Sequence, residues 1–221
     1  MIKQQVRSRI EQIGIVPLAR ATTAEEALFA AEAVVTGGIP ILEIPLTVPE
    51  AVQVISMVRR KSPDIVVGAG SVADIDSARK CLDAGATFLS SDGFDSETVA
   101  FAVRQDVVVI AGTLTPSEVT SAWKLGPDFI KIVPCGHVGG ESYIRSLKAM
   151  FPTVRMIAAG GVNQRTAFDF IRAGATSELR PFRGGGDQGR RVPGRERRYQ
   201  LQEFLLEPNW QTGVGDRAGS V

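Results

Sequence analysis

The chain has 221 residues, of which 44% are apolar and 22% charged, and its formal net charge is +1. These values are those of an ordinary soluble protein, and they give no electrostatic reason to expect a nucleic acid or a membrane surface as partner. Cys81 and Cys135 have no CxxC spacing, and the single histidine, His137, cannot complete a metal cluster with them. We therefore expect reduced thiols, no metal site and a cytoplasmic location.

The first residues, MIKQQVRSRIEQIG, interleave charged side chains with Val6, Ile10 and Ile13. This spacing predicts a short amphipathic helix and lacks the apolar centre of a signal peptide. No segment of the chain approaches the roughly 20 apolar residues that a membrane span needs.

Further along the chain, one unit recurs: a stretch with helical apolar spacing, a glycine, and a short apolar run. Glycine supplies the left-handed residue that ends a helix, and the apolar run is typical of a buried parallel strand. One such helix, TAEEALFAAEAVV, begins with Thr23 as its predicted N-cap, and Glu26 follows three residues later. We predict seven strands, near residues 14–19, 39–46, 64–69, 86–91, 107–112, 128–134 and 154–159. Seven such units predict an α/β fold, a (β/α)8 barrel of the TIM type.

The eighth unit departs from this pattern. The segment IRAGAT repeats the earlier LDAGAT, but residues 177–221 then contain eight Arg, eight Gly and no run of β-branched residues. By composition this tail is irregular, so we expect the eighth strand and last helix to be missing or replaced and the barrel to comprise residues 1–176. An open barrel exposes strand edges and should be poorly stable. A shifted reading frame is one hypothesis for the tail; a nucleic-acid arm is disfavoured because six acidic residues dilute its charge.

Candidate catalytic residues lie within two of the strands. In a barrel of this kind the active site is built at the carboxyl ends of the strands, which here also carry Ser90, Ser91 and Thr113. Glu43 in ILEIPL and Lys131 in FIKIVP are flanked by aliphatic residues, and a charge in such a core is either paired or takes part in chemistry. A desolvated amine has a nucleophilic neutral fraction that can form a Schiff base with a ketone, while a carboxylate can move protons on the adduct. The alternative is a buried Glu43–Lys131 ion pair that only fills the core.

Six segments, GIVPLARATTAEEA, GGIPILEIPLTVPEA, VGAGSV, LTPSE, FIKIVPCGHVGG and AAGGVN, occur in an order and spacing that resemble the 2-keto-3-deoxy-6-phosphogluconate (KDPG) aldolase family. The resemblance covers residues 10–176 and implies a homotrimeric class I aldolase that needs no metal or cofactor. It implies cleavage of a 2-keto-4-hydroxy acid to pyruvate and an aldehyde, which is glyceraldehyde 3-phosphate when KDPG is the substrate. By this resemblance Lys131 is the Schiff-base lysine and Glu43 the proton acceptor and donor. Substrate contacts are implied for Arg20 as an anion contact, Ser71 near the pyruvate carboxylate, and the amides of Gly160 and Gly161 at the phosphate.

Several positions differ from the family pattern. Thr47 stands where many members have arginine, so carboxylate binding would rest more on Arg20 and Ser71. Asp92 stands where proline is common, and Ala159 stands where a threonine hydroxyl would lie near the phosphate. These differences keep open 4-hydroxy-2-oxoglutarate (KHG) and non-phosphorylated 2-keto-3-deoxy acids as substrates. They also keep open a catalytically impaired relic with a disrupted C-terminus.

Overall fold

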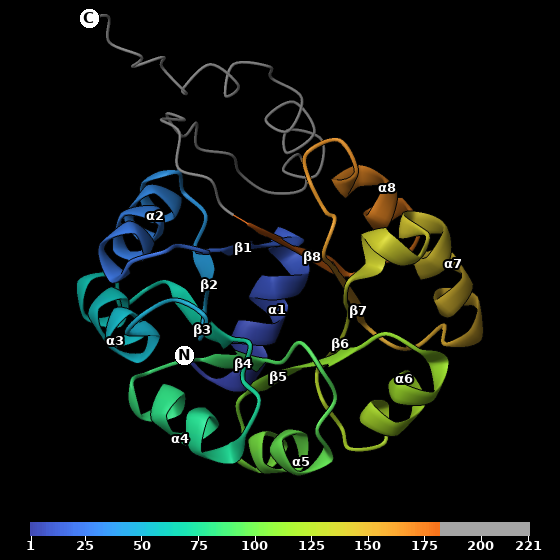
Figure 1. Ribbon diagram of the computed structural model, residues 1–221, viewed down its shortest axis with the longest axis horizontal. Coiled ribbons are helices and arrows are strands. Elements are labelled where there is room, and N and C mark those ends of the chain that lie inside the picture. The colour runs from blue at the N-terminus through green and yellow to red at the C-terminus, as the bar shows by residue number, and fades with distance from the viewer. Residues whose placement is uncertain (182–221) are drawn as a thin grey trace, which may run out of the picture.

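The structure of the protein is a computed structural model that describes residues 1–181. Within them, parallel strands alternate with helices, and the strands pair in chain order until β8 meets β1, which closes a barrel (Figure 1). The strands are β1 (Ile15–Leu18), β2 (Ile41–Pro45), β3 (Val66–Gly70), β4 (Phe88–Ser90), β5 (Val108–Thr113), β6 (Phe129–Ile132), β7 (Met156–Ala159) and β8 (Ser177–Pro181). The predicted α/β barrel of the TIM type is confirmed, with each of the seven predicted strands present at its expected place.

The expectation of a missing eighth strand is wrong. Ser177–Pro181 forms β8, which pairs in parallel with β7 through Ile157 and Ser177 and with β1 through Val16 and Leu179. The barrel therefore extends beyond the predicted boundary at residue 176, and β1 and β7 have no exposed edge in the described part of the chain. The predictions for the rest of the tail, including the missing last helix, fall on residues 182–221, outside the described residues.

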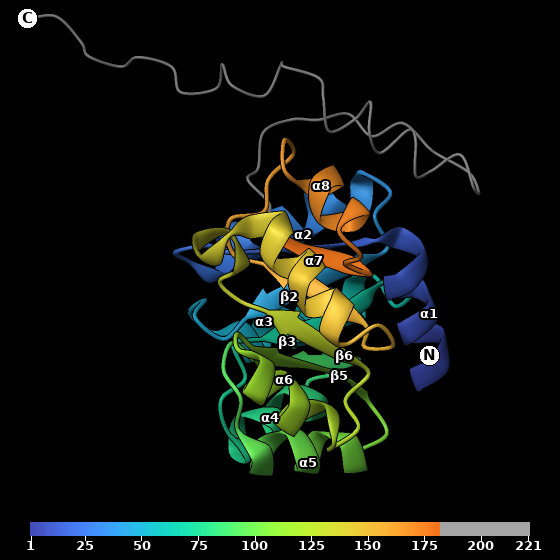
Figure 2. The same cartoon turned by 90° about the vertical axis from the view of Figure 1, so that its right-hand side faces the viewer.

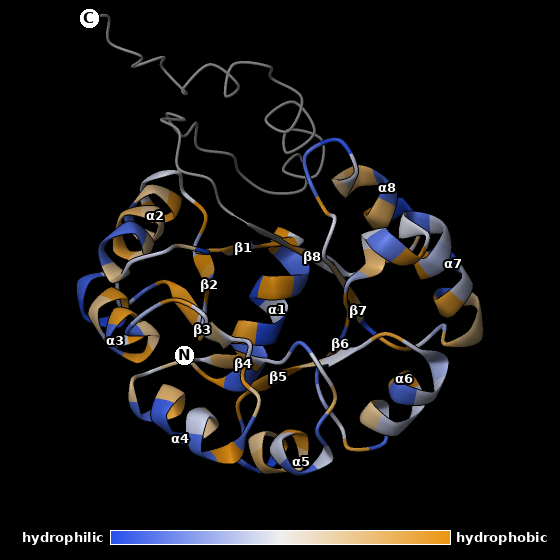
Figure 3. Ribbon diagram, in the orientation of Figure 1, coloured by the Kyte–Doolittle hydropathy of each residue, from blue (hydrophilic) through white to orange (hydrophobic). Residues whose placement is uncertain are grey.

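Helices surround the barrel on its outer side (Figure 1). They are α2 (Ala24–Thr36), α3 (Ala51–Lys61), α4 (Ile75–Asp83), α5 (Ser96–Arg104), α6 (Pro116–Trp123), α7 (Gly140–Met150) and α8 (Ala167–Arg172), with a short 3-10 helix η1 (Cys135–Val138) before α7. Several begin at a side-chain cap: Thr23 accepts a hydrogen bond from the Glu26 N–H, as predicted, and Thr115 forms a capping box with Glu118 ahead of Pro116. Their polar residues lie mainly on the outside and their apolar residues toward the strands (Figure 3).

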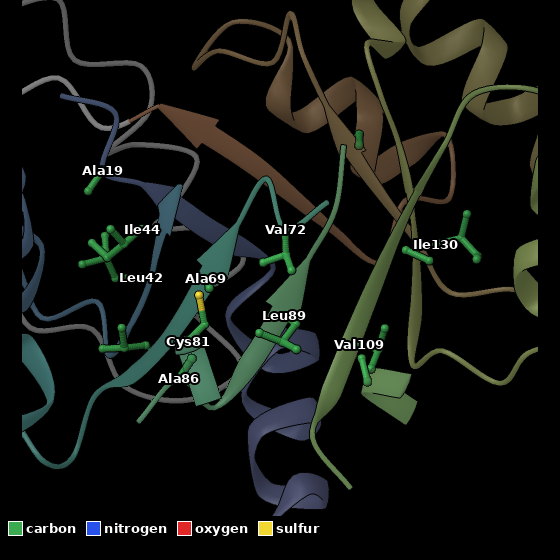
Figure 4. Packing of buried hydrophobic residues seen from close by; sticks show 14 of the residues in the cluster. Ala19, Leu42, Ile44, Ala69, Val72, Cys81, Ala86, Leu89, Val109 and Ile130 are labelled. Carbon is green, nitrogen blue, oxygen red and sulfur yellow. The ribbon is translucent and has the colours of Figure 1, made fainter. Parts of the chain in front are cut away.

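The alternation of side chains along each strand builds two cores. The outer core lies between the strands and the helices, and Figure 4 shows part of it, including Leu42, Ile44, Leu89, Val109 and Ile130. The inner core fills the barrel itself and contains Val16, Leu18, Ile41, Val66, Phe88, Val108, Ile110, Phe129, Ile157, Ala159 and Leu179.

The predicted N-terminal helix is confirmed as α1 (Lys3–Ile13), which lies at the end of the barrel where the strands begin (Figure 2). Val6 and Ile10 of α1 belong to the inner core. Lys3 Nζ lies 3.1 Å from the carboxylate of buried Asp128, which also accepts a hydrogen bond from the Val109 N–H. The contacts of Val6, Ile10 and Lys3 thus hold α1 against this end of the barrel. No helix within residues 1–181 is both long enough and apolar enough to cross a membrane.

Candidate active site

Glu43 on β2 and Lys131 on β6 point into the barrel interior. Their neighbours Leu42, Ile44, Ile130 and Ile132 all belong to the outer core, so alternation turns the two ionisable side chains inward. Each is only 2% exposed. The structure therefore brings the two predicted catalytic residues into one interior, from opposite sides of the closed barrel.

Glycines at inward-facing positions leave room for these side chains. A Cβ on Gly70 of β3 would overlap the Glu43 carboxylate, and one on Gly68 would overlap the ring of Phe88. A Cβ on Gly112 of β5 would lie 2.5 Å from the backbone oxygen of Ser91 and 2.6 Å from the carbonyl carbon of Asp92. Gly70 thus leaves the space that the Glu43 carboxylate occupies, and Gly112 lets the backbone of Ser91 and Asp92 come close to β5.

Lys131 is held by two oxygen atoms at the end of β4. Its Nζ donates to the Asp92 carboxylate at 2.7 Å and to the Ser90 hydroxyl at 3.0 Å. Although Lys131 is buried, the Asp92 side chain is 59% exposed. The ion pair of Lys131 is thus with Asp92, and no ion pair joins Glu43 to Lys131 in the described structure. The alternative in which these two residues form a core-filling pair is wrong.

Asp92 also connects Lys131 to two of the predicted substrate contacts. The Ser71 hydroxyl donates to Asp92 Oδ2 at 2.6 Å, and the positive charge of Arg20 acts on the same carboxylate. Partial burial raises the pKa of Asp92, but the Lys131 ammonium, the hydrogen bonds from Lys131 and Ser71, and Arg20 together hold that pKa below its usual value. Asp92 is therefore ionised at neutral pH.

Glu43 has the opposite electrostatic environment. Burial, helped by the negative charge of Asp92, raises the pKa of Glu43 from 4.5 to about 7, although the Lys131 charge and a hydrogen bond with Ser90 oppose the shift. Glu43 Oε2 is buried and has no hydrogen-bond partner in the described structure. A carboxyl group that titrates near neutral pH and keeps one oxygen unengaged can both accept and donate a proton.

The other predicted contacts lie at the same end of the barrel but are less closely linked to Lys131. Arg20 follows β1 and is exposed, and Thr47 is exposed in the turn after β2. No hydrogen bond or ion pair among residues 1–181 joins Thr47 to Lys131 or Glu43.

Gly160 and Gly161 follow β7 with φ values of 74° and 86°. A Cβ on Gly160 would lie 2.9 Å from Pro134, and one on Gly161 would lie 2.8 Å from Gly136. The Gly136 N–H donates to the Gly160 carbonyl at 2.8 Å. Close packing against the segment after β6 is therefore one reason for the two glycines, whether or not their amides bind a phosphate.

Asp92 is the functional candidate that sequence reasoning missed. It was noted only as a departure from the family pattern, whereas Ser90 had been recognised as a polar strand end. The available signal was an acidic residue two positions after a strand whose last residue is polar, in FLSSDG. Residues 1–181 contain no group of three or more His, Cys, Asp or Glu side chains that could hold a metal ion.

Comparisons with known proteins assign the chain to a family. The family model described as "KDPG and KHG aldolase" matches residues 6–179. A 2-dehydro-3-deoxy-phosphogluconate aldolase of Treponema pallidum is 27% identical over 162 residues, which are 73% of this chain and 77% of the relative.

Two solved structures extend the comparison. The KDPG aldolase of Zymomonas mobilis ATCC 29191 superposes with a TM-score of 0.72 at 26% identity, over 81% of this chain and 85% of its own. The KDPG aldolase of Legionella pneumophila, with pyruvate captured as a covalent carbinolamine, gives a TM-score of 0.75 over 91% of this chain and 97% of its own. Its 22% identity supports a likeness of fold alone.

Proposed function

Because this chain belongs to the KDPG and KHG aldolase family, we propose that it is a class I aldolase that cleaves a 2-keto-4-hydroxy acid through a Schiff base on Lys131. The observation that carries the proposal is the buried Lys131 Nζ inside a closed barrel that also encloses Glu43, a carboxyl group with a pKa of about 7. A nucleophile and a proton carrier that titrates near the working pH are the two groups that this chemistry requires.

The proposed reaction begins when the neutral amine of Lys131 attacks the C2 ketone and forms a carbinolamine. A proton from solvent lets the carbinolamine hydroxyl leave as water, and the resulting iminium ion withdraws electrons from the C3–C4 bond; the final hydrolysis returns that proton to solvent. Glu43 as carboxylate takes the proton from the C4 hydroxyl, the C3–C4 bond breaks, and its electrons form an enamine on Lys131 while the aldehyde leaves. Glu43 then returns the proton to C3, and water releases pyruvate and the amine. No redox step or metal ion enters this sequence.

The substrate that we favour is KDPG, with 4-hydroxy-2-oxoglutarate or a non-phosphorylated 2-keto-3-deoxy acid as the alternatives. Arg20 and Ser71 at the mouth of the barrel support recognition of an anion, and the amides of Gly160 and Gly161 are our candidates for a phosphate contact. A comparison of kcat/KM for the three substrates decides among them. We also propose a homotrimer, which light scattering on purified protein tests directly.

Borohydride trapping of pyruvate tests the Schiff base. We expect a mass gain on Lys131 in the unaltered chain, and Lys131→Met should lose both the trapped adduct and retro-aldol activity. Lys124→Met is the matched control, because Lys124 is an exposed lysine at the end of α6. An adduct that persists in Lys131→Met would refute the assignment. A soluble unaltered chain that traps no pyruvate would favour the catalytically impaired relic, an alternative that the closed barrel already makes less favourable.

A further inference from the structure

The carboxylate of Asp92 occupies hydrogen-bond donors that a substrate carboxylate would need. Its Oδ1 accepts from Lys131 Nζ at 2.7 Å, and its Oδ2 accepts from the Ser71 hydroxyl at 2.6 Å. The positive charge of Arg20 acts on the same group. One internal anion therefore engages the reactive amine and the Ser71 hydroxyl, which is expected to bind an external anion.

The geometry of a 2-keto acid bound to Lys131 brings its carboxylate into the same region. In such an adduct the nitrogen, C2, C1 and a carboxylate oxygen follow the same three-bond path as N, Cα, C and O of a peptide backbone, so that oxygen lies roughly 3 Å from Nζ. Asp92 Oδ1 already lies at 2.7 Å from that nitrogen. In the iminium adduct the nitrogen keeps a single N–H and Ser71 offers a single O–H, so two carboxylates compete for these donors, and their like charges repel.

The Asp92 side chain has room to rotate away from Lys131 and Ser71. Its side chain is 59% exposed and lies beyond the last residue of β4, beside Gly93, where a Cβ would meet nothing within 4 Å. The backbone before it is held by β5, since the Ser91 N–H donates to the Ile110 carbonyl at 3.1 Å. Rotation of the Asp92 side chain into solvent would therefore free the Ser71 hydroxyl and Lys131 without unfolding the strand.

We infer that Asp92 is a specificity-determining residue of the proposed aldolase: its carboxylate competes with the carboxylate of the 2-keto acid for Ser71 and Lys131, and the substrate must displace it. The inference rests on the proposed function, since it presumes that Lys131 bonds the ketone carbon. Its consequence is that Asp92 weakens the binding of ketones that carry an adjacent carboxylate and has a smaller effect on neutral ketones.

The test compares two ketones in the full-length chain and in Asp92→Asn. The amide keeps the size of the carboxylate but removes its charge and weakens its bonds to Lys131 and Ser71. In borohydride trapping, we expect the half-saturating concentration of pyruvate to fall on the order of tenfold. The reason is that the free energy of a hydrogen bond to a charged group corresponds to a change in affinity of about that size. The half-saturating concentration of hydroxyacetone, which lacks the carboxylate, should change much less. Thermal melts verify that the variant is folded.

Asp95→Asn is the matched control. Asp95 lies in the same loop and caps α5 through the Thr98 N–H, and asparagine is an equally good cap. This variant removes one negative charge near the site without touching Lys131, so it should leave the preference for pyruvate over hydroxyacetone at its original value. A similar shift in Asp95→Asn would mean that the overall negative potential near the site, and not displacement of the Asp92 carboxylate, sets the preference for pyruvate over hydroxyacetone.

Other outcomes separate the failure of this inference from that of the proposed function. If the unaltered chain traps no ketone, the Schiff-base proposal itself fails. If it traps pyruvate but Asp92→Asn shifts both ketones equally, or weakens pyruvate, competition is refuted. If Asp92→Asn instead slows trapping of both ketones at saturation, Asp92 moves protons at Lys131, and the competition inference is overturned.

Discussion

Glu43 should make the stability of the protein depend on pH in a direction opposite to that of most carboxylates. Its pKa is raised from 4.5 to about 7 by burial, so the folded state holds a proton that the unfolded state releases. At low pH both states are protonated and there is no penalty. As the pH rises through the window between these two pKa values, the unfolded state binds fewer protons than the folded state, and the free energy of unfolding falls.

The size of the effect follows from the shift itself. The difference between 4.5 and about 7 is about 2.5 pH units, and each unit corresponds to about 1.4 kcal/mol, so the total loss is about 3.5 kcal/mol. Most of it should occur between about pH 4.5 and about pH 7. Because a domain of this kind is stable by only about 5 to 15 kcal/mol, the effect is readily measured.

The measurement is urea unfolding of the unaltered chain and of Glu43→Gln at several pH values, at a fixed protein concentration so that any oligomer contributes equally. The difference in unfolding free energy between the two should fall with pH by the stated amount. Glu118→Gln is the control: hydrogen bonds from Thr115 and Leu114 lower the pKa of Glu118, so above about pH 6 it is ionised in both states and its difference should stay flat. Below that pH its difference should rise with pH, opposite in sign to that of Glu43→Gln. A flat or rising difference for Glu43→Gln would refute the reasoning.

Two further substitutions test the space around Glu43 and the closure of the barrel. Gly70→Ala places a Cβ that overlaps the Glu43 carboxylate and lies 2.7 Å from its Cδ, so proton exchange at the methyl group of pyruvate should fall about 100-fold or more while trapping on Lys131 persists. Exchange at the original rate, measured by NMR in deuterium oxide, would contradict this. Leu179→Ala removes a 4% exposed side chain of β8 from the inner core and should cost about 2–5 kcal/mol in urea unfolding. A loss below about 0.5 kcal/mol would mean that β8 contributes no packing in solution.

Most of the fold could be predicted because the strands carry runs of aliphatic residues and the helices carry explicit start signals. Thr23 caps its helix as the sequence indicates. The amphipathic spacing of Val6 and Ile10 predicted α1, although not its place at the end of the barrel. That place depends on Asp128, whose pairing with Lys3 joins residues too far apart in sequence for any local pattern to indicate.

The eighth strand escaped prediction because SELRP contains one strongly apolar residue and ends in proline. Propensity argues against a strand with such a sequence. Backbone pairing outweighs this low strand propensity. β7 and β1 each present a row of backbone donors and acceptors, and β8 pairs with both strands at once. Leu179 supplies an apolar side chain of this strand to the inner core. Barrel closure is a property of the whole sheet, which a reading of one segment does not contain.

The sequence could predict those residues of the candidate site that lie on strands, because strand periodicity sets which side chains point inward. Once β2 and β6 are placed, the two-residue period of a strand turns Glu43 and Lys131 inward. The same rule assigns inward positions to Gly70 and Ser90, so small residues lie beside the two charged side chains. Asp92 lies two residues past the end of β4, where that rule no longer applies and the loop alone sets its direction. The residue that pairs with the nucleophile was therefore the one that the sequence could not place, and the electrostatics of the site depend on it: without Asp92 the Lys131 amine would lack its charged partner, and the pKa of Glu43 would lose one of the influences that raise it.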